Sequence, residues 1–107
     1  MGWFKKRYSK NVTRDNEFMK EYAIKVNGLL LYAEENANVT KALNVLKDDL
    51  QYTVATDDSA AKGVERKIKK EFSALTAALQ QDGWDEAEVL MYIKNIRRYI
   101  VEINAMR

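Results

Sequence analysis

The last quarter of the chain carries the pattern that most restricts the fold. Asp85 is a favourable N-cap residue, and Gly83 just before it suits the left-handed backbone that often follows a helix end. After this break, branched apolar residues recur at alternating spacings of four and three: Val89, Ile93, Ile96, Ile100 and Ile103. This spacing places them on one face of a long helix. Such a helix needs partners of similar length to bury that face.

The upstream sequence predicts three partner helices, each with one apolar face. The first begins near Thr13 or Asp15 and runs to about residue 36, and the others span about residues 38–54 and 60–81. Asn38 or Thr40 is expected to cap the second one. The third helix alternatively begins after Gly63. Each of the four helices has about 20 residues and therefore a length of roughly 30 Å.

These helices predict an all-α fold, since proline is absent and glycine is rare. The predicted loops are short, and short loops force consecutive helices to run antiparallel. We therefore expect an antiparallel, up-down-up-down four-helix bundle over residues 15–107, preceded by a basic-aromatic N-terminal arm over residues 1–14. The alternative is a pair of long hairpins that complete their core by dimerising.

The predicted core contains the apolar residues that repeat with helical spacing. It comprises Phe18, Leu29, Leu43, Leu46, Leu50, Ile68, Phe72, Leu75, Val89, Ile93, Ile96 and Ile100. Gly28 interrupts the first helix at a cost of about 1 kcal/mol relative to alanine, and we interpret it as the site of a close helix crossing.

The composition excludes several kinds of chemistry. The chain has neither cysteine nor histidine, so no thiol nucleophile, no Ser-His mechanism and no Cys/His zinc site can form. Adjacent carboxylates such as Asp48 and Asp49 point about 100° apart on a helix and do not share one target. We expect no enzymatic activity, metal, cofactor or small-molecule substrate. The lack of cysteine fits a reducing compartment, so we expect a cytoplasmic protein.

The N-terminal arm combines aromatic and basic side chains. It carries five basic residues and no acidic one, so the rest of the chain sums to about 2 − 5 = −3. The candidate binding residues here are Trp3, Phe4, Lys5, Lys6, Arg7 and Lys10. Such a segment either docks on the bundle or inserts its aromatic side chains into an anionic membrane surface.

Two helices carry a second apolar pair away from their core faces. Ile24 and Leu31 lie seven residues apart on the first helix, and Val45 and Tyr52 have the same spacing on the second. Seven residues are about two turns, so each pair forms a short stripe. We expect Ile24 and Leu31 to be covered by the arm or by a second subunit.

Charged residues are expected to gather at opposite ends of the bundle. The basic end would hold Lys62, Arg66, Lys67, Lys69, Lys70, Arg97, Arg98 and Arg107, and the acidic end Glu34, Glu35, Asp82, Asp85, Glu86 and Glu88. Part of this layout opposes the helix dipole, because Lys62 and Arg66 lie near a helix N-terminus. We count Lys62, Arg66, Lys69 and Lys70 as candidate binding residues.

Two functions follow as hypotheses. The first is a non-enzymatic interaction module that binds a protein partner, or a second copy, through its surface apolar stripes. The second is a peripheral binder of an anionic surface through the basic end and the arm. An acidic membrane suits the arm better than nucleic acid, because the net charge is only +2.

Overall fold

The computed structural model describes residues 17–53 and 59–106 of the chain. These residues form helices joined by short breaks and contain no strand, which confirms the all-α prediction. The predicted arm, residues 1–14, lies outside the described residues.

Four long helices make up the described structure. The first helix covers residues 17–30 and continues into a short 3-10 helix, η1 (Leu31–Ala33). It is followed by α2 (Ala37–Gln51), α3 (Ala60–Leu79) and α4 (Glu86–Ala105). The predicted spans agree with these bounds within a few residues, except at the end of the first helix, where the 3-10 turn replaces the last α-helical turn.

Side-chain caps explain where α2 and α4 begin. Asp85 caps α4 by accepting a hydrogen bond from the backbone N–H of Glu88 at 3.1 Å, as predicted. The cap of α2 is Asn36, whose Oδ1 accepts from the backbone N–H of Val39 at 2.9 Å. The prediction of Asn38 or Thr40 was wrong, because the chain turns more tightly after η1 and the extended backbone needed for an N-cap falls at Asn36.

The two ends of α3 are formed differently. Gly83 adopts a φ of 68°, the left-handed conformation that was expected after α3. At the other end, α3 begins at Ala60 rather than after Gly63, although Ser59 makes no side-chain cap bond.

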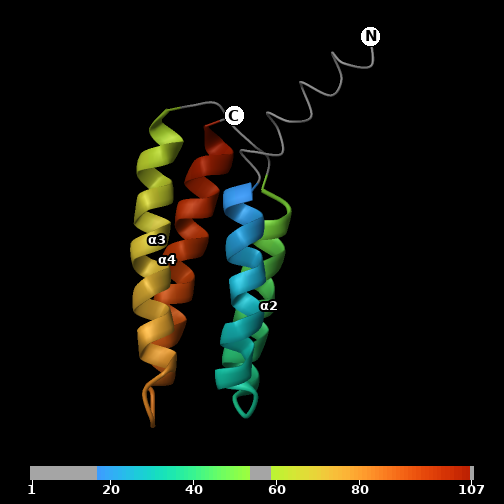
Figure 1. Cartoon of the computed structure of the whole chain (residues 1–107), viewed down its shortest axis with the longest axis vertical. Coiled ribbons are helices and arrows are strands. Elements are labelled where there is room, and N and C mark those ends of the chain that lie inside the picture. The colour runs from blue at the N-terminus through green and yellow to red at the C-terminus, as the bar shows by residue number, and fades with distance from the viewer. Residues whose placement is uncertain (1–16, 54–58, 107) are drawn as a thin grey trace.

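The four helices lie side by side as two hairpins (Figure 1). The first helix and α2 form one hairpin, and α3 and α4 form the other. In this view the first helix lies in front of α2, and α3 lies in front of α4. The extensive packing is between α3 and α4 and between α2 and α4, and the ring of Tyr22 on the first helix meets that of Phe72 on α3 at 4.9 Å.

This packing creates two seams between the hairpins. One seam joins the first helix to α3, and the other joins α2 to α4 (Figure 1). Each seam joins helices of different hairpins, so no loop ties its two sides together. Side-chain packing alone sets how closely the helices approach there.

The core lies along the axis between the hairpins. Eleven of the twelve predicted core residues are buried, including Ile68, Leu75 and Ile96, which are fully enclosed. Phe18 is the exception and is only half-buried. Its ring packs on that of Tyr22, with the ring centres 4.9 Å apart.

Candidate interaction surface

The first helix presents an apolar ridge to solvent. Ile24 is 68% exposed and Leu31 is 70% exposed, and the glycine between them, Gly28, is exposed as well. We call these three residues the ridge. They lie on one side of the helix because they are spaced four and three residues apart. The arm and a second subunit, which were expected to cover Ile24 and Leu31, lie outside the described residues, so this expectation stays a prediction.

An open groove runs beside the ridge, along the seam between the first helix and α3. It encloses about 890 Å³. The buried or nearly buried side chains of Tyr22, Leu29 and Phe72 contribute to its lining, and Leu31 and Tyr32 lie along it on the first helix. Besides Phe72, the lining from α3 is small or polar: Ser73, Thr76, Ala77 and Gln80. The groove is therefore mainly apolar with a polar rim, the usual make-up of a protein-binding surface.

Lys25 places a positive charge within the groove. Its Nζ lies 3.6 Å from Oε1 of Glu21 and 4.6 Å from the centre of the Tyr22 ring. An exposed i,i+4 ion pair of this kind contributes about 0.3–0.5 kcal/mol. The ammonium group thus remains accessible to a ligand that carries negative charge.

Gly28 has no internal role that requires a glycine. A Cβ added there would meet no heavy atom within 4 Å, so the predicted close crossing of helices is absent from the described structure. A glycine inside a helix still costs about 1 kcal/mol relative to alanine. The residue therefore leaves a gap in the exposed ridge that nothing in the described chain fills.

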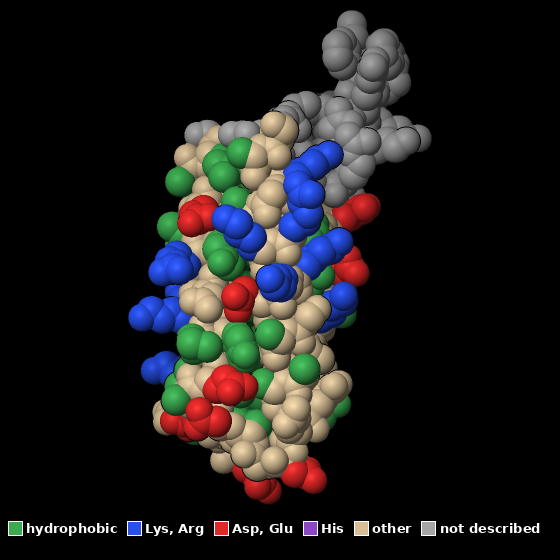
Figure 2. Space-filling model, turned by 90° about the vertical axis from the view of Figure 1, so that its left-hand side faces the viewer, with side chains coloured by type: hydrophobic (Ala, Val, Ile, Leu, Met, Phe, Trp, Pro, Cys, Tyr) green, Lys and Arg blue, Asp and Glu red, His purple; other side chains and the backbone are tan. Residues whose placement is uncertain are grey.

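The predicted basic residues continue the same seam toward the opposite end. Lys62, Arg66 and Lys69 line a second hollow together with Phe18 and Glu65. Figure 2 shows lysine and arginine gathered over the upper part of one face and acidic side chains concentrated toward its lower end. Lys70 is exposed on α3 but does not line this hollow.

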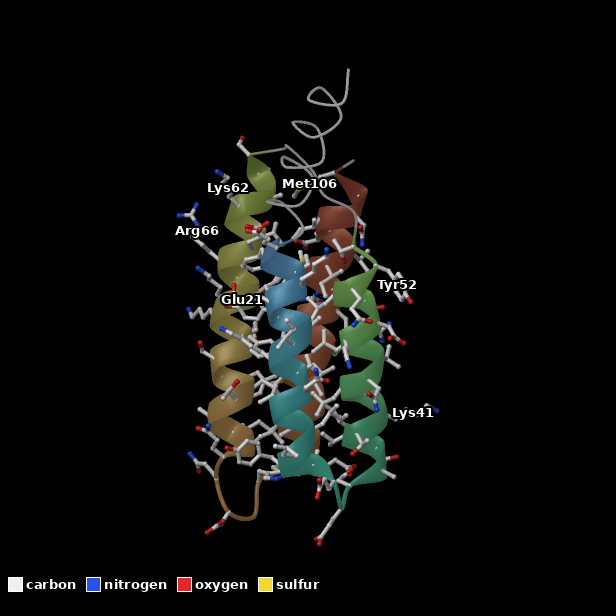
Figure 3. The ribbon with its side chains drawn as sticks, turned by 45° about the vertical axis from the view of Figure 1, so that its right-hand side comes forward. Glu21, Lys41, Tyr52, Lys62, Arg66 and Met106 are labelled. Carbon is white, nitrogen blue, oxygen red and sulfur yellow. The ribbon has the colours of Figure 1, made fainter. Side chains whose placement is uncertain are left out.

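The structure brings only part of the predicted site together. The first helix and α3 lie next to each other in Figure 3, with Lys62 and Arg66 projecting outward from α3. Ile24 and Leu31 thus share a seam with the basic hollow, although they lie nearer its other end. The remaining candidates, Trp3, Phe4, Lys5, Lys6, Arg7 and Lys10, lie outside the described residues.

The two residues of the second apolar pair, Val45 and Tyr52, differ in their exposure. Tyr52 is 79% exposed, whereas Val45 is half-buried and lines a hollow on the α2–α4 seam with Leu90. Val45 is therefore not a spare surface residue, because the neighbouring helix α4 covers part of it. Val101 on α4 is 65% exposed and was missed. Its place beside Ile100 hid it within an apolar run.

The described residues hold no metal-binding cluster. Within them, histidine, cysteine and acidic side chains form no group of three or more that could hold a metal ion. Tyr92 and Tyr99 on α4 are half-buried, and the Nζ of Lys67 lies 5.8 Å from the ring centre of Tyr99. No described helix combines the length and apolar character needed to cross a bilayer.

Comparison with known proteins does not assign the chain to a family. No family model matches the sequence, and neither a curated protein nor a solved structure is significantly similar. The functional argument therefore rests on the ridge and the groove.

Proposed function

We propose that the protein is an antiparallel, up-down-up-down four-helix bundle that acts as a non-enzymatic interaction module. The ridge and the adjoining groove form its binding surface, and the partner is a protein. The observation that carries the proposal is the exposure of Ile24 and Leu31 directly beside a groove lined by Leu29 and Phe72.

The energetic argument is that these side chains gain from being covered. Burying a leucine or isoleucine that was exposed is favourable by about 1.5–3 kcal/mol. Binding energy concentrates where such anchors enter a preformed pocket that contains aromatic side chains. Here Tyr22 and Phe72 help to form such a pocket, and Leu31 and Tyr32 also line it. A partner helix would suit this surface, since it could lay an apolar face along the groove.

The test uses a photo-crosslinking residue at position 24 or 31 of the full chain in its native cells. We expect a discrete protein adduct from both positions. The matched control carries the same residue at Met91, which is half-exposed on α4 and lies away from the ridge. Adducts from Met91 alone, or from no position, would contradict the proposal.

A second candidate function is binding to an anionic membrane surface. The observation in its favour is the hollow in which Phe18 lies among Lys62, Arg66 and Lys69. Each basic residue near an acidic bilayer contributes about 1 kcal/mol, and the predicted arm would add five more. An apolar ring among such charges can enter the headgroup region.

Co-sedimentation with vesicles tests this second function. Vesicles with phosphatidylserine should retain the protein at low salt, and binding should weaken as the Debye length falls from about 30 Å at 0.01 M to about 8 Å at 0.15 M. The variant Lys62→Glu/Arg66→Glu/Lys69→Glu should bind less. Equal binding to neutral vesicles would rule out a role for these charges.

A further inference from the structure

The exposed ridge of the first helix suits a two-fold contact. In a two-fold dimer the same patch meets itself, so an exposed stripe on one copy can be covered by the same stripe on the other. Here Ile24 and Leu31 are exposed, and Gly28 and Leu31 also belong to the lining of the groove that the first helix shares with α3. A two-fold rotation about an axis across the first helix lays the ridge of each copy on the ridge of the other.

Gly28 gives such a contact its closest point. It lies between Ile24 and Leu31, and both its missing side chain and the space around it leave room for a neighbouring helix. Helices packed across small residues approach more closely than helices packed across large ones. A two-fold axis near Gly28 then places Ile24 of one copy close to Leu31 of the other.

Charge along the seam selects the antiparallel orientation. Lys62, Arg66 and Lys69 lie at one end of the seam, and Glu34 and Glu35 follow Leu31 at the other. Antiparallel packing brings the acidic end of each copy toward the basic end of the other, whereas parallel packing would bring like charges together. Exposed pairs add little affinity, but like-charge contacts penalise the wrong orientation.

We propose that the partner of the ridge is a second copy of this chain, packed antiparallel about a two-fold axis close to Gly28. The inference rests on the proposed function and names the partner. The exposed ridge, the open glycine and the opposed charges are three separate observations, and a second copy accounts for all of them.

The first test is sedimentation equilibrium of the full chain over a wide range of concentrations. We expect a reversible monomer–dimer equilibrium. Ile24→Lys/Leu31→Lys should abolish the dimer and leave a folded monomer, because both side chains are exposed. Circular dichroism checks that the helices remain.

A glycine pair separates dimer contacts from folding. Gly28→Gln should raise the dimer dissociation constant about tenfold or more, because a bulky side chain fills the point of closest approach. The same change at Gly63 is the matched control, since its Cβ would also meet nothing within 4 Å. Both variants should melt no lower than the parent when dilution has made the chain monomeric. Equal dissociation constants for the two variants would overturn the proposal.

Charge reversal tests the orientation. Glu34→Lys/Glu35→Lys should weaken the dimer several-fold, and adding Arg66→Glu/Lys69→Glu to the same chain should restore it. Failure of the second pair to restore affinity would overturn the antiparallel arrangement.

Failure of the dimer inference can be distinguished from failure of the proposed function. A chain that sediments as a monomer at every concentration overturns the inference. Crosslinks from position 24 to a different protein would then leave the proposed function standing. Crosslinks that join position 24 only to another residue of the same molecule would contradict both the dimer and the proposed function.

Discussion

Arg97 donates a hydrogen bond from Nε to Oδ2 of Asp49 at 2.6 Å, which joins α4 to the end of α2. The two residues lie 48 positions apart in the chain. They face each other across a seam between helices of different hairpins. Because no loop ties these helices together, a contact of this kind helps to set how far one hairpin slides along the other.

The Arg97–Asp49 pair should show weak but measurable coupling. In a double-mutant cycle with Arg97→Ala and Asp49→Ala, we expect a coupling energy of about 0.2–1 kcal/mol, since both side chains remain partly exposed. The coupling should shrink at high salt. Urea unfolding of the four proteins measures it, and a coupling that does not respond to salt would contradict an ionic contact.

Ile96 should be among the most sensitive core positions. Ile96→Ala is expected to lower the free energy of unfolding by about 2–5 kcal/mol, because the side chain is fully buried and its loss leaves a cavity. Met91→Ala on the same helix is the control and should change it by less than about 0.5 kcal/mol. Similar values for both variants would show that this face of α4 is not packed.

The cap of α4 should contribute through one hydrogen bond. Asp85→Ala is expected to cost about 0.5–2 kcal/mol, because the N–H of Glu88 loses its acceptor. Asp85→Asn keeps a side-chain oxygen and should recover most of the loss. Thermal unfolding followed by circular dichroism distinguishes the three proteins, and an unchanged melting temperature for the alanine variant would exclude a functional cap.

Replacing either of two glycines with alanine should change the stability of the fold in opposite directions. Gly83→Ala should destabilise the fold by about 1–2 kcal/mol, because φ is 68° there. Gly28→Ala should stabilise the monomer by up to about 1 kcal/mol, since it lies within a helix and its Cβ meets nothing. Chemical denaturation below the dimer dissociation constant measures both. Effects of the same sign would contradict one of the two assignments.

The hydrogen bonds of Asn36, in the turn before α2, provide a further test. Asn36 accepts from Val39 through Oδ1 and donates from Nδ2 to Oε1 of Glu86 at 2.7 Å. Asn36→Asp keeps the cap but replaces the donor with a charge beside Glu86. We expect it to be less stable than the parent at neutral pH. Stability should recover in the further variant Glu86→Gln, and the absence of recovery would show that the two side chains do not interact.

The periodic spacing of apolar residues was enough to predict the helices and most of the core. The apolar stripes from Val89 to Ile103 on α4 and from Ala61 to Leu79 on α3 are buried, as the spacing of their residues implies. The reason is that the angular position of a residue on a helix depends only on its number. The cap at Asp85 and the turn at Gly83 were equally legible, since both depend on backbone preferences of single residues. The cap of α2 was predicted at Asn38 or Thr40, which are also good N-cap residues, whereas the structure places it at Asn36.

The sequence by itself thus determined which residues form each helix and which face of each helix is apolar. Only the tertiary structure decided which helices lie next to each other, that the first helix shares a groove with α3, and that Val45 is partly covered while Ile24 is not. The physical reason is that helical periodicity is a local property. Neighbour relations between hairpins depend on packing among residues far apart in the chain, and a single apolar stripe fits several such arrangements.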